Sequence, residues 1–194
     1  GADGPRRHPG AVVRPAAAHE VRIIGGQWKR SKLPVADRPG LRPTPDRVRE
    51  TLFNWLGQDL PGWACLDLFA GSGALGFEAA SRGAGRVVMI ERDPKAIGAL
   101  EKNRTTLGAG QVDILRADAL AWLANSRETF DLIFVDPPFD SGVAGTVLAE
   151  LARHLESGGQ AYIEQAAPVV APPGLTVRRS GRAGRSHFAL LVKE

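Results

Sequence analysis

The chain has 194 residues and a mass of 20.7 kDa, with 43% hydrophobic residues, 24% charged residues and a net charge of +4. This length suits one domain with a full core and excludes the two domains of an ordinary nicotinamide-dependent dehydrogenase. No apolar run approaches the roughly 18 residues of a membrane span, so we expect a cytoplasmic protein without a membrane partner. With one cysteine, Cys65, and four scattered histidines, the sequence predicts no disulfide and no metal site. A monomer is favoured because the sequence has no obvious assembly element.

The basic residues gather near the two ends of the chain. Residues 1–50 carry 11 Lys and Arg against 5 Asp and Glu, and residues 171–194 carry 5 against 1, whereas residues 51–170 carry 9 against 15. Basic segments around a less basic body favour a polyanionic partner such as a nucleic acid, because Lys and Arg release counterions from phosphates. Residues 1–20 lack the apolar core of a signal peptide and are predicted to form a flexible tail.

The first ordered segment is predicted to be a β-hairpin within residues 21–35, with Gly25 and Gly26 at its turn. A helix follows, for which Thr44 is the expected N-cap and Pro45 the first helical residue. This helix is expected to end near Gly57. Together these elements form a small N-terminal extension, residues 21–57, ahead of a larger domain, residues 58–194.

From residue 64 onward, apolar strands alternate with helical segments. The expected strands are residues 64–70, 86–91, 112–118, 130–136, 159–165, 175–180 and 186–194. This order predicts an α/β fold with a doubly wound, mostly parallel sheet, a terminal antiparallel hairpin and an antiparallel strand at the sheet edge. Ligands in such sheets bind beyond the carboxyl ends of the strands.

A glycine loop follows the first of these strands. Gly71, Gly73 and Gly76 match G-x-G-x-x-G, and Glu91 lies twenty residues after Gly71, as in a dinucleotide site. The glycines let the backbone approach a ligand closely, so the pattern fits several nucleotides and does not choose among them. Asp67 discriminates better, because a carboxylate just before the loop repels a pyrophosphate and attracts the ammonium group of S-adenosylmethionine.

Two further acids end the next two strands. Glu91 can accept hydrogen bonds from both ribose hydroxyls, for S-adenosylmethionine and NAD alike. Asp118, with the backbone amide that follows it, can bind the edge of an adenine, although a helix cap is an equally ordinary role for this residue. Together with Asp67, these strand-end acids indicate a site for a nucleoside-bearing cofactor.

The motif "DPPF", Asp136–Phe139, directly follows the apolar residues 130–135. Its two prolines fix an extended turn and remove two amide donors, so that carboxylate and carbonyl oxygens face the site as acceptors. Such acceptors suit an exocyclic amine of a base, whose lone pair becomes nucleophilic when its hydrogens are drawn out of the ring plane. Phe139 can stack on the base, which has to be unpaired or flipped out to enter.

These motifs resemble a known family. "DLFAGSGALGFEAASRGA", the acid of "IERD", "RADAL" and "DPPF" are similar to successive motifs of class I S-adenosylmethionine-dependent methyltransferases that methylate amines. The segments "RIIGGQWKRSKLPV" and "GLRPTPDRVRETLFNWL" narrow the resemblance to the bacterial RsmD family, over about residue 21 to the C-terminus. The resemblance implies a seven-stranded class I sheet and methylation of N2 of a guanine in small-subunit (16S) ribosomal RNA, with a ribosomal particle as the suggested substrate.

The resemblance also implies roles for individual residues. The cofactor is expected to be held by Asp67, Gly71 and Gly73 at its methionine part, by Glu91 at its ribose, and by Asp118 and Ala119 at its adenine. The target guanine is expected to be held by Asp136, Pro137 and Phe139. Arg42, Thr44, Arg47 and Arg49 lie in the segment that is expected to border the cofactor and RNA. Alternatively, Arg47 and Arg49 lie on the solvated face of a helix. The candidate RNA contacts of the hairpin are Trp28, Lys29, Arg30 and Lys32.

Three other functions stay open at this level. The target could be another nucleic-acid amine, such as N6 of adenine in DNA. Asp rather than Asn at position 136, before the two prolines, and Phe rather than Tyr at position 139 disfavour this alternative. A nicotinamide-dependent oxidoreductase would explain the glycine loop but not "DPPF". A non-catalytic RNA-binding assembly factor could retain the same fold.

Overall fold

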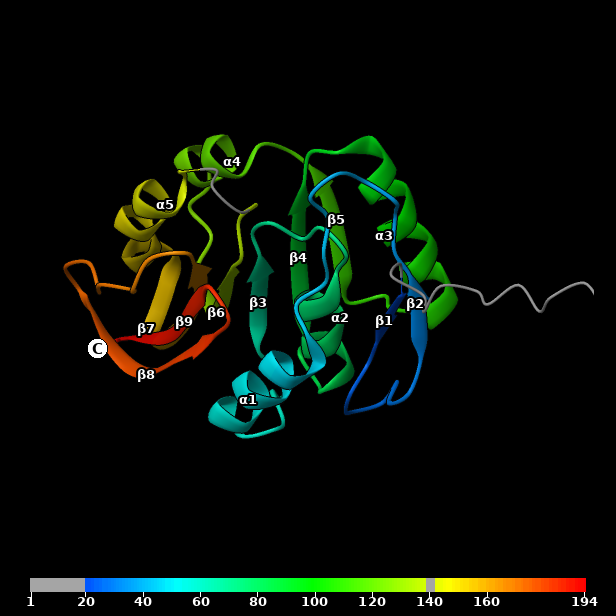
Figure 1. Ribbon diagram of the computed structural model, residues 1–194, viewed down its shortest axis with the longest axis horizontal. Coiled ribbons are helices and arrows are strands. Elements are labelled where there is room, and N and C mark those ends of the chain that lie inside the picture. Colours follow the sequence, from blue (N-terminus) through cyan, green and yellow to red (C-terminus); the bar gives the residue numbers. More distant parts are fainter. Residues whose placement is uncertain (1–19, 139–141) are drawn as a thin grey trace, which may run out of the picture.

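The computed structural model describes residues 20–138 and 142–194, and a seven-stranded sheet forms its centre. The strands are β3 (Ala64–Asp67), β4 (Arg86–Glu91), β5 (Val112–Arg116), β6 (Phe130–Val135), β7 (Leu155–Gln165), β8 (Leu175–Ala183) and β9 (Ser186–Lys193). Their order in the sheet is β5-β4-β3-β6-β7-β9-β8 (Figure 1). β3 to β7 are parallel, so the predicted doubly wound, mostly parallel sheet is confirmed. The expected tail lies outside the described residues, apart from Glu20.

Helices cover both faces of the sheet. They are α1 (Asp46–Leu56), α2 (Ala74–Ser81), α3 (Pro94–Leu107), α4 (Ala119–Asn125) and α5 (Ala144–Leu151), the last continued by a 3-10 turn (Ala152–His154). α1, α2 and α3 share one apolar cluster with Phe134 and Tyr162, whereas α4 and α5 share the other with Val135 and Ile163. Because both faces are covered, the central strands carry apolar residues at consecutive positions rather than only at alternate ones.

The C-terminal hairpin completes the sheet. β9 is antiparallel to both of its neighbours, with Ala189 opposite Ile163 of β7 and Leu191 opposite Val177 of β8. The predicted terminal antiparallel hairpin is therefore confirmed: β8 forms the edge of the sheet and pairs antiparallel with β9, which lies between β8 and β7. The side chains explain this order, because residues 188–191 of β9 are buried while most of β8 is exposed.

The N-terminal hairpin is also present. β1 (Glu20–Arg22) pairs antiparallel with β2 (Lys32–Pro34), and Asn103 of α3 donates to the carbonyl of Pro34 at 2.8 Å. The hairpin lies beside α2 and α3 (Figure 1). The expected turn at Gly25 and Gly26 is only part of a longer connection, residues 23–31, so this detail of the prediction is wrong.

The connecting loop packs on the C-terminal end of α2. The backbone N–H of Gln27 donates to the carbonyl of Ser81 at 2.7 Å, and the Ser81 hydroxyl donates to the carbonyl of Gly25 at 2.6 Å. Gly26 has a φ of +77°, and a Cβ atom there would lie 2.0 Å from the Ser81 carbonyl oxygen. The glycines therefore allow a close contact between backbones, which a search for a two-residue turn does not anticipate.

Helix α1 begins one residue later than expected. Its N-cap is Pro45, which makes no side-chain cap bond, and the hydroxyl of Thr44 instead donates to Oδ2 of Asp136 at 2.9 Å. The predicted N-cap at Thr44 is therefore wrong, because its hydroxyl is used at the sheet. The helix ends at Gly57, with φ at +96°, as predicted.

Arg49 is buried, so its predicted place on a solvated helix face is wrong, whereas Arg47 is exposed. The Arg49 guanidinium lies 3.2 Å from Oε1 of Glu78, which is fully buried on α2, and Nε of Arg82 lies 2.9 Å from Oε2 of the same carboxylate. Glu78 also accepts the backbone N–H groups of residues 24 and 25. One buried carboxylate therefore joins the N-terminal extension to the larger domain.

Two properties concern the described residues alone. Within residues 20–138 and 142–194, no helix has the length and apolar character needed to cross a membrane. The same residues contain no group of three or more His, Cys, Asp and Glu side chains that could hold a metal ion. Cys65 is buried in β3, which fits the role of a small core residue.

Candidate active site

The glycine loop joins β3 to α2 at the carboxyl edge of the sheet. Gly71 and Gly73 both have positive φ, at +53° and +79°. A Cβ atom at Gly73 would lie 2.7 Å from side-chain carbons of Leu100 and Phe77, so the loop has no space for larger residues. The tight turn leads the backbone directly into the N-terminus of α2, where amide groups are available to a ligand.

Asp67 ends β3 beneath this loop. Only 2% of its surface is exposed, and its Oδ2 accepts the backbone N–H of Gly76 at 3.0 Å. Burial raises the pKa of Asp67 to about 7, the Gly76 bond opposes this change, and Glu91 adds to it. Within the described residues no Lys, Arg or His forms an ion pair with Asp67. A cationic ligand group would therefore stabilise its ionised form.

Glu91 ends β4, next to Asp67. Burial raises the pKa of its carboxyl, and hydrogen bonds from the backbone amides of Asp93, Arg92 and Gly71 oppose the shift. The carboxylate is half-buried and thus within reach of a ligand. The hydrogen bond from Gly71 connects the end of β4 to the glycine loop.

Residues 36–45 cross over this region on their way to α1. Nε of Arg38 lies 3.0 Å from Oδ2 of Asp93, which is the N-cap of α3. Leu41 lies so close to the glycine loop that a Cβ atom at Gly71 would be 2.9 Å from its Cδ1. The N-terminal extension therefore covers part of the predicted cofactor site.

Asp118 and Ala119 follow β5 at the start of α4. Asp118 is exposed, and its Oδ2 accepts the backbone N–H of Ala121 at 3.0 Å, so it is the N-cap of this helix. Ala119 is buried. The helix-cap role considered from the sequence is confirmed, and contact with an adenine stays a prediction.

Asp136 and Pro137 follow β6 and are half-buried. Besides the bond from Thr44, the surroundings of Asp136 are acidic. Burial raises the pKa of Asp136 to about 7, nearby Glu164 and Asp67 add to the rise, and the Thr44 hydroxyl opposes it. Phe139 lies outside the described residues, so its predicted contact with a base stays a prediction.

Sequence reasoning missed two residues beside Asp136. Tyr162 is fully buried in β7, and its hydroxyl donates to Oε2 of Glu164 at 3.0 Å. Glu164 lies near the carboxyl end of β7, so the rule that identified the other strand-end acids would also have found it.

The predicted RNA contacts lie mostly on the surface. Arg42 and Arg47 are exposed, as are Lys29, Arg30 and Lys32 of the N-terminal loop and strand. Trp28 is half-buried and packs against the core, so only part of its ring is available to a partner.

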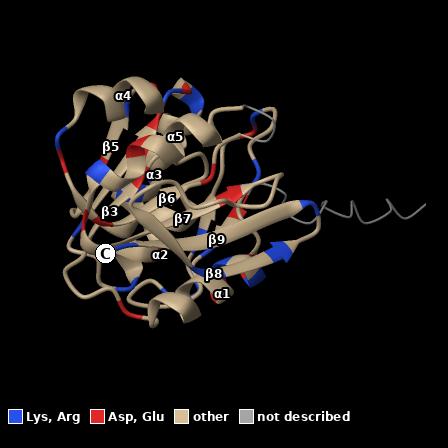
Figure 2. Ribbon diagram, turned by 90° about the vertical axis from the view of Figure 1, so that its left-hand side faces the viewer, with Lys and Arg blue, Asp and Glu red and all other residues tan. Residues whose placement is uncertain are grey.

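A second basic group lies on the C-terminal hairpin. Its exposed arginines are Arg178, Arg179, Arg182 and Arg185. Figure 2 shows basic residues along β8 and near the turn to β9. Gln165, the last residue of β7, pairs with His187 near the start of β9. The turn between β8 and β9 therefore extends beyond the carboxyl ends of the parallel strands, which is the side of the sheet where Asp136 lies.

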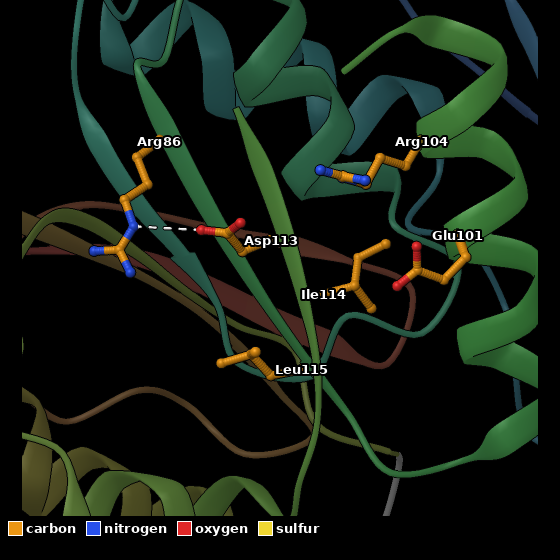
Figure 3. A pocket seen from close by; sticks show the side chains of 6 residues that line it. All are labelled: Arg86, Glu101, Arg104, Asp113, Ile114 and Leu115. Carbon is orange, nitrogen blue, oxygen red and sulfur yellow. Dashed lines mark ion pairs between the residues drawn. The ribbon is translucent and has the colours of Figure 1, made fainter. Parts of the chain in front are cut away.

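A surface pocket of about 300 Å³ lies elsewhere, at the opposite edge strand β5. Its lining residues are Arg86, Glu101, Arg104, Asp113, Ile114 and Leu115 (Figure 3). Arg86 and Asp113 form an ion pair of 3.6 Å across it. None of the predicted site residues lines this pocket, so we do not assign the active site to it.

The comparisons with known proteins agree on one family. The model of the family described as conserved hypothetical protein 95 matches residues 21–192. The chain is 43% identical to ribosomal RNA small subunit methyltransferase D of Escherichia coli over 185 residues, which cover 90% of this chain and 91% of the relative. The chain belongs to the RsmD family.

Other RsmD relatives support this assignment. The Haemophilus influenzae ribosomal RNA small subunit methyltransferase D is 40% identical over 92% of this chain and 97% of its own length. The structure of the Escherichia coli protein yhhF, described as a methyltransferase, has a TM-score of 0.82 and 42% identity over 90% of this chain and 98% of its own.

This RsmD-family protein is an S-adenosylmethionine-dependent methyltransferase. Its residues fit the cofactor, because the glycine loop has no space for larger residues and the buried Asp67 carboxylate lacks a cationic partner among the described residues. The family assignment decides against a nicotinamide-dependent oxidoreductase and against a non-catalytic factor.

Proposed function

We propose that the enzyme methylates the exocyclic N2 of a guanine in small-subunit ribosomal RNA. The relatives named ribosomal RNA small subunit methyltransferase D support the RNA class. The observation that carries the choice of an amine is Asp136, a half-buried carboxylate held by Thr44 and followed by two prolines that offer carbonyl oxygens but no N–H groups.

The cofactor roles follow from the strand ends. Asp67 and the backbone at Gly71 and Gly73 bind the methionine part, Glu91 binds the ribose hydroxyls, and Asp118 with the Ala119 amide binds the adenine. S-adenosylmethionine, when bound, supplies an already activated methyl group. The protein therefore has to bind, orient and exclude water rather than form a covalent intermediate.

The target amine is oriented by Asp136 and the carbonyl of Pro137. Both accept its hydrogens, which directs the nitrogen lone pair away from the ring and toward the methyl group. When the nitrogen takes the methyl group from the sulfonium sulfur, it would give up one of these hydrogens as a proton, and the Asp136 carboxylate would accept this proton. Phe139 stacks on the guanine, and the base leaves its RNA stack to reach this position. Positioning and electrostatics supply most of the rate enhancement.

The RNA backbone lies against the exposed basic residues of the N-terminal extension and against the exposed arginines of the C-terminal hairpin. Arg42, Thr44 and Arg47 border the cofactor and RNA, and Trp28, Lys29, Arg30 and Lys32 contact the RNA from the extension, residues 21–57. Residues 58–194 form the methyltransferase domain. We further propose that the enzyme acts as a cytoplasmic monomer. Its proposed substrate is a ribosomal particle, since assembled RNA would present the target guanine in a fixed conformation.

The substitution Asp136→Ala tests this assignment. We expect methyl transfer to small ribosomal particles to fall at least about 100-fold, because the variant has no carboxylate to orient the amine. Binding of S-adenosylmethionine, measured by isothermal titration calorimetry, should stay close to that of the wild type. Normal turnover of the variant would show that "DPPF" is not the catalytic motif.

A further inference from the structure

Glu164 stands next to the proposed amine site. β6 and β7 are parallel, with Phe134 opposite Tyr162 and Val135 opposite Ile163. One residue further along each strand, Asp136 and Glu164 therefore lie side by side at the carboxyl edge. Side chains at matched positions of neighbouring strands point to the same face, and here that face is the one covered by α1.

The carboxylate of Glu164 is held in place from its own side of the sheet. The hydroxyl of Tyr162, two residues earlier on the same face, donates to Oε2 at 3.0 Å. The Ser186 side chain, at the start of β9, forms a second hydrogen bond with this carboxylate. Tyr162 is fully buried, so one of the two hydroxyl groups that hold Glu164 is fixed in position, and Ser186 still holds the carboxylate when the Tyr162 hydroxyl is removed.

Neither acid is neutralised by the part of the chain that the structure describes. No described Lys, Arg or His forms an ion pair with Asp136 or Glu164. Burial raises the pKa of both carboxyls, and for Asp136 the neighbouring Glu164 is the second cause. Two adjacent carboxylates that, among the described residues, receive hydrogen bonds from hydroxyl groups alone favour a ligand with adjacent N–H groups.

We propose that Glu164 accepts the N1–H of the target guanine while Asp136 and the Pro137 carbonyl hold the N2 amine. This inference rests on the proposed function and names the residue that selects the base. Guanine has N1–H next to its 2-amine, so that both carboxylates face donors. Adenine has an N1 lone pair next to its 6-amine, and a carboxylate facing that lone pair would be repelled and left unpaired.

The test compares guanine with 2-aminopurine at the methylated position of the RNA, reconstituted into the particle. 2-Aminopurine retains the 2-amine but has a lone pair at N1. The preference is the ratio of kcat/KM for the two bases. Because each variant is compared with itself, a general loss of folding or activity cancels in this ratio.

For the wild type we expect a strong preference for guanine. For Glu164→Ala we expect this preference to fall about 10- to 100-fold, the value of one hydrogen bond to a charged group. Tyr162→Phe is the matched control, since it removes a donor to Glu164 but keeps the carboxylate, and its preference should stay within about threefold of the wild type.

The outcomes separate this inference from the proposed function. If the wild type does not methylate N2 of guanine, the proposed function is wrong. If it does and Glu164→Ala retains the full preference, only the role of Glu164 is wrong. Should Glu164→Ala fail to fold, the nearly isosteric Glu164→Gln takes its place. Its neutral acceptor should lower the preference, and an unchanged ratio would overturn the proposal.

Discussion

At the scale of single residues, the chemistry depends on where each carboxylate is placed and which groups surround it. Asp67, Glu91 and Asp136 are all ordinary acids in the sequence, and burial raises the pKa of each. Thr44 is the one described hydroxyl that donates to Asp136, and Arg49 in turn holds the carbonyl of Thr44 at 3.1 Å. The extension therefore contributes one hydrogen bond to the proposed amine acceptor, and this bond opposes the rise in the pKa of Asp136 that burial and Glu164 cause.

The pH dependence of methyl transfer should show this ionisation. Asp136 has to be a carboxylate to accept the amine, so kcat/KM should rise as the pH increases through about 7 and then level off. The apparent value belongs to Asp136 and Glu164 together. Thr44→Val removes the bond that lowers the pKa of Asp136, which should move this limb to higher pH. If this limb of the pH profile does not move in the variant, Thr44 does not influence the titration.

The stability of the enzyme should depend strongly on Glu78. Its replacement by alanine leaves the buried Arg49 and Arg82 without their shared carboxylate, and we expect a decrease of about 3–5 kcal/mol in the free energy of unfolding. Urea denaturation measures the difference. Glu50→Ala, on the exposed face of α1, is the control and should change stability by less than about 0.5 kcal/mol. Similar values for the two variants would contradict the buried network.

At the scale of secondary-structure elements, local patterns are sufficient for most of the sheet. The predicted bounds of β4 agree with the structure to the residue, and α3 begins at Pro94 and ends before Gly108 as the sequence indicates, since proline and glycine mark helix ends by their backbone preferences. The failures come from partners distant in the sequence. Thr44 resembles an N-cap because its hydrogen-bond partner lies 92 residues away, and Arg49 resembles a solvated residue because Glu78 is on another helix.

Two glycine substitutions should have opposite effects on the elements that contain them. Gly26→Ala places a methyl group against the Ser81 carbonyl at a positive φ and should lower the free energy of unfolding by about 1–3 kcal/mol. Gly98→Ala lies on the exposed face of α3, where a Cβ atom meets nothing within 4 Å, and should raise stability by about 0.5–1 kcal/mol. Thermal unfolding of both variants checks the signs. A stabilising Gly26→Ala would mean that the loop does not pack on α2 as described.

At the scale of the whole molecule, the N- and C-terminal parts of the chain meet across α1. Trp55 of α1 stacks on Phe188 of β9 with ring centroids 5.5 Å apart, and Nη1 of Arg178 donates to the carbonyl of Trp55 at 3.2 Å. The charge pattern of the sequence indicates a polyanionic partner, but only the fold connects the basic hairpin of the C-terminus to the extension. Pairing between distant segments is what sequence patterns do not contain.

The salt dependence of RNA binding should identify the basic residues that contact phosphates. The double substitution Lys29→Ala with Lys32→Ala should weaken binding and reduce the slope of log K against log salt by about 1 for each phosphate that a lysine no longer neutralises. Lys102→Ala with Arg127→Ala, both exposed positions outside the proposed RNA surface, should leave the slope unchanged. Equal slopes for the two double variants would show that Lys29 and Lys32 of the N-terminal hairpin do not contact RNA phosphates.

The central claim is the identity of the methylated atom. Small ribosomal particles that lack the modification would be incubated with the enzyme and isotopically labelled S-adenosylmethionine, and the RNA digested and analysed by mass spectrometry. We expect the label in N2-methylguanosine at a single position of the small-subunit RNA. Label in N6-methyladenosine, or no incorporation with active cofactor binding, would contradict the account.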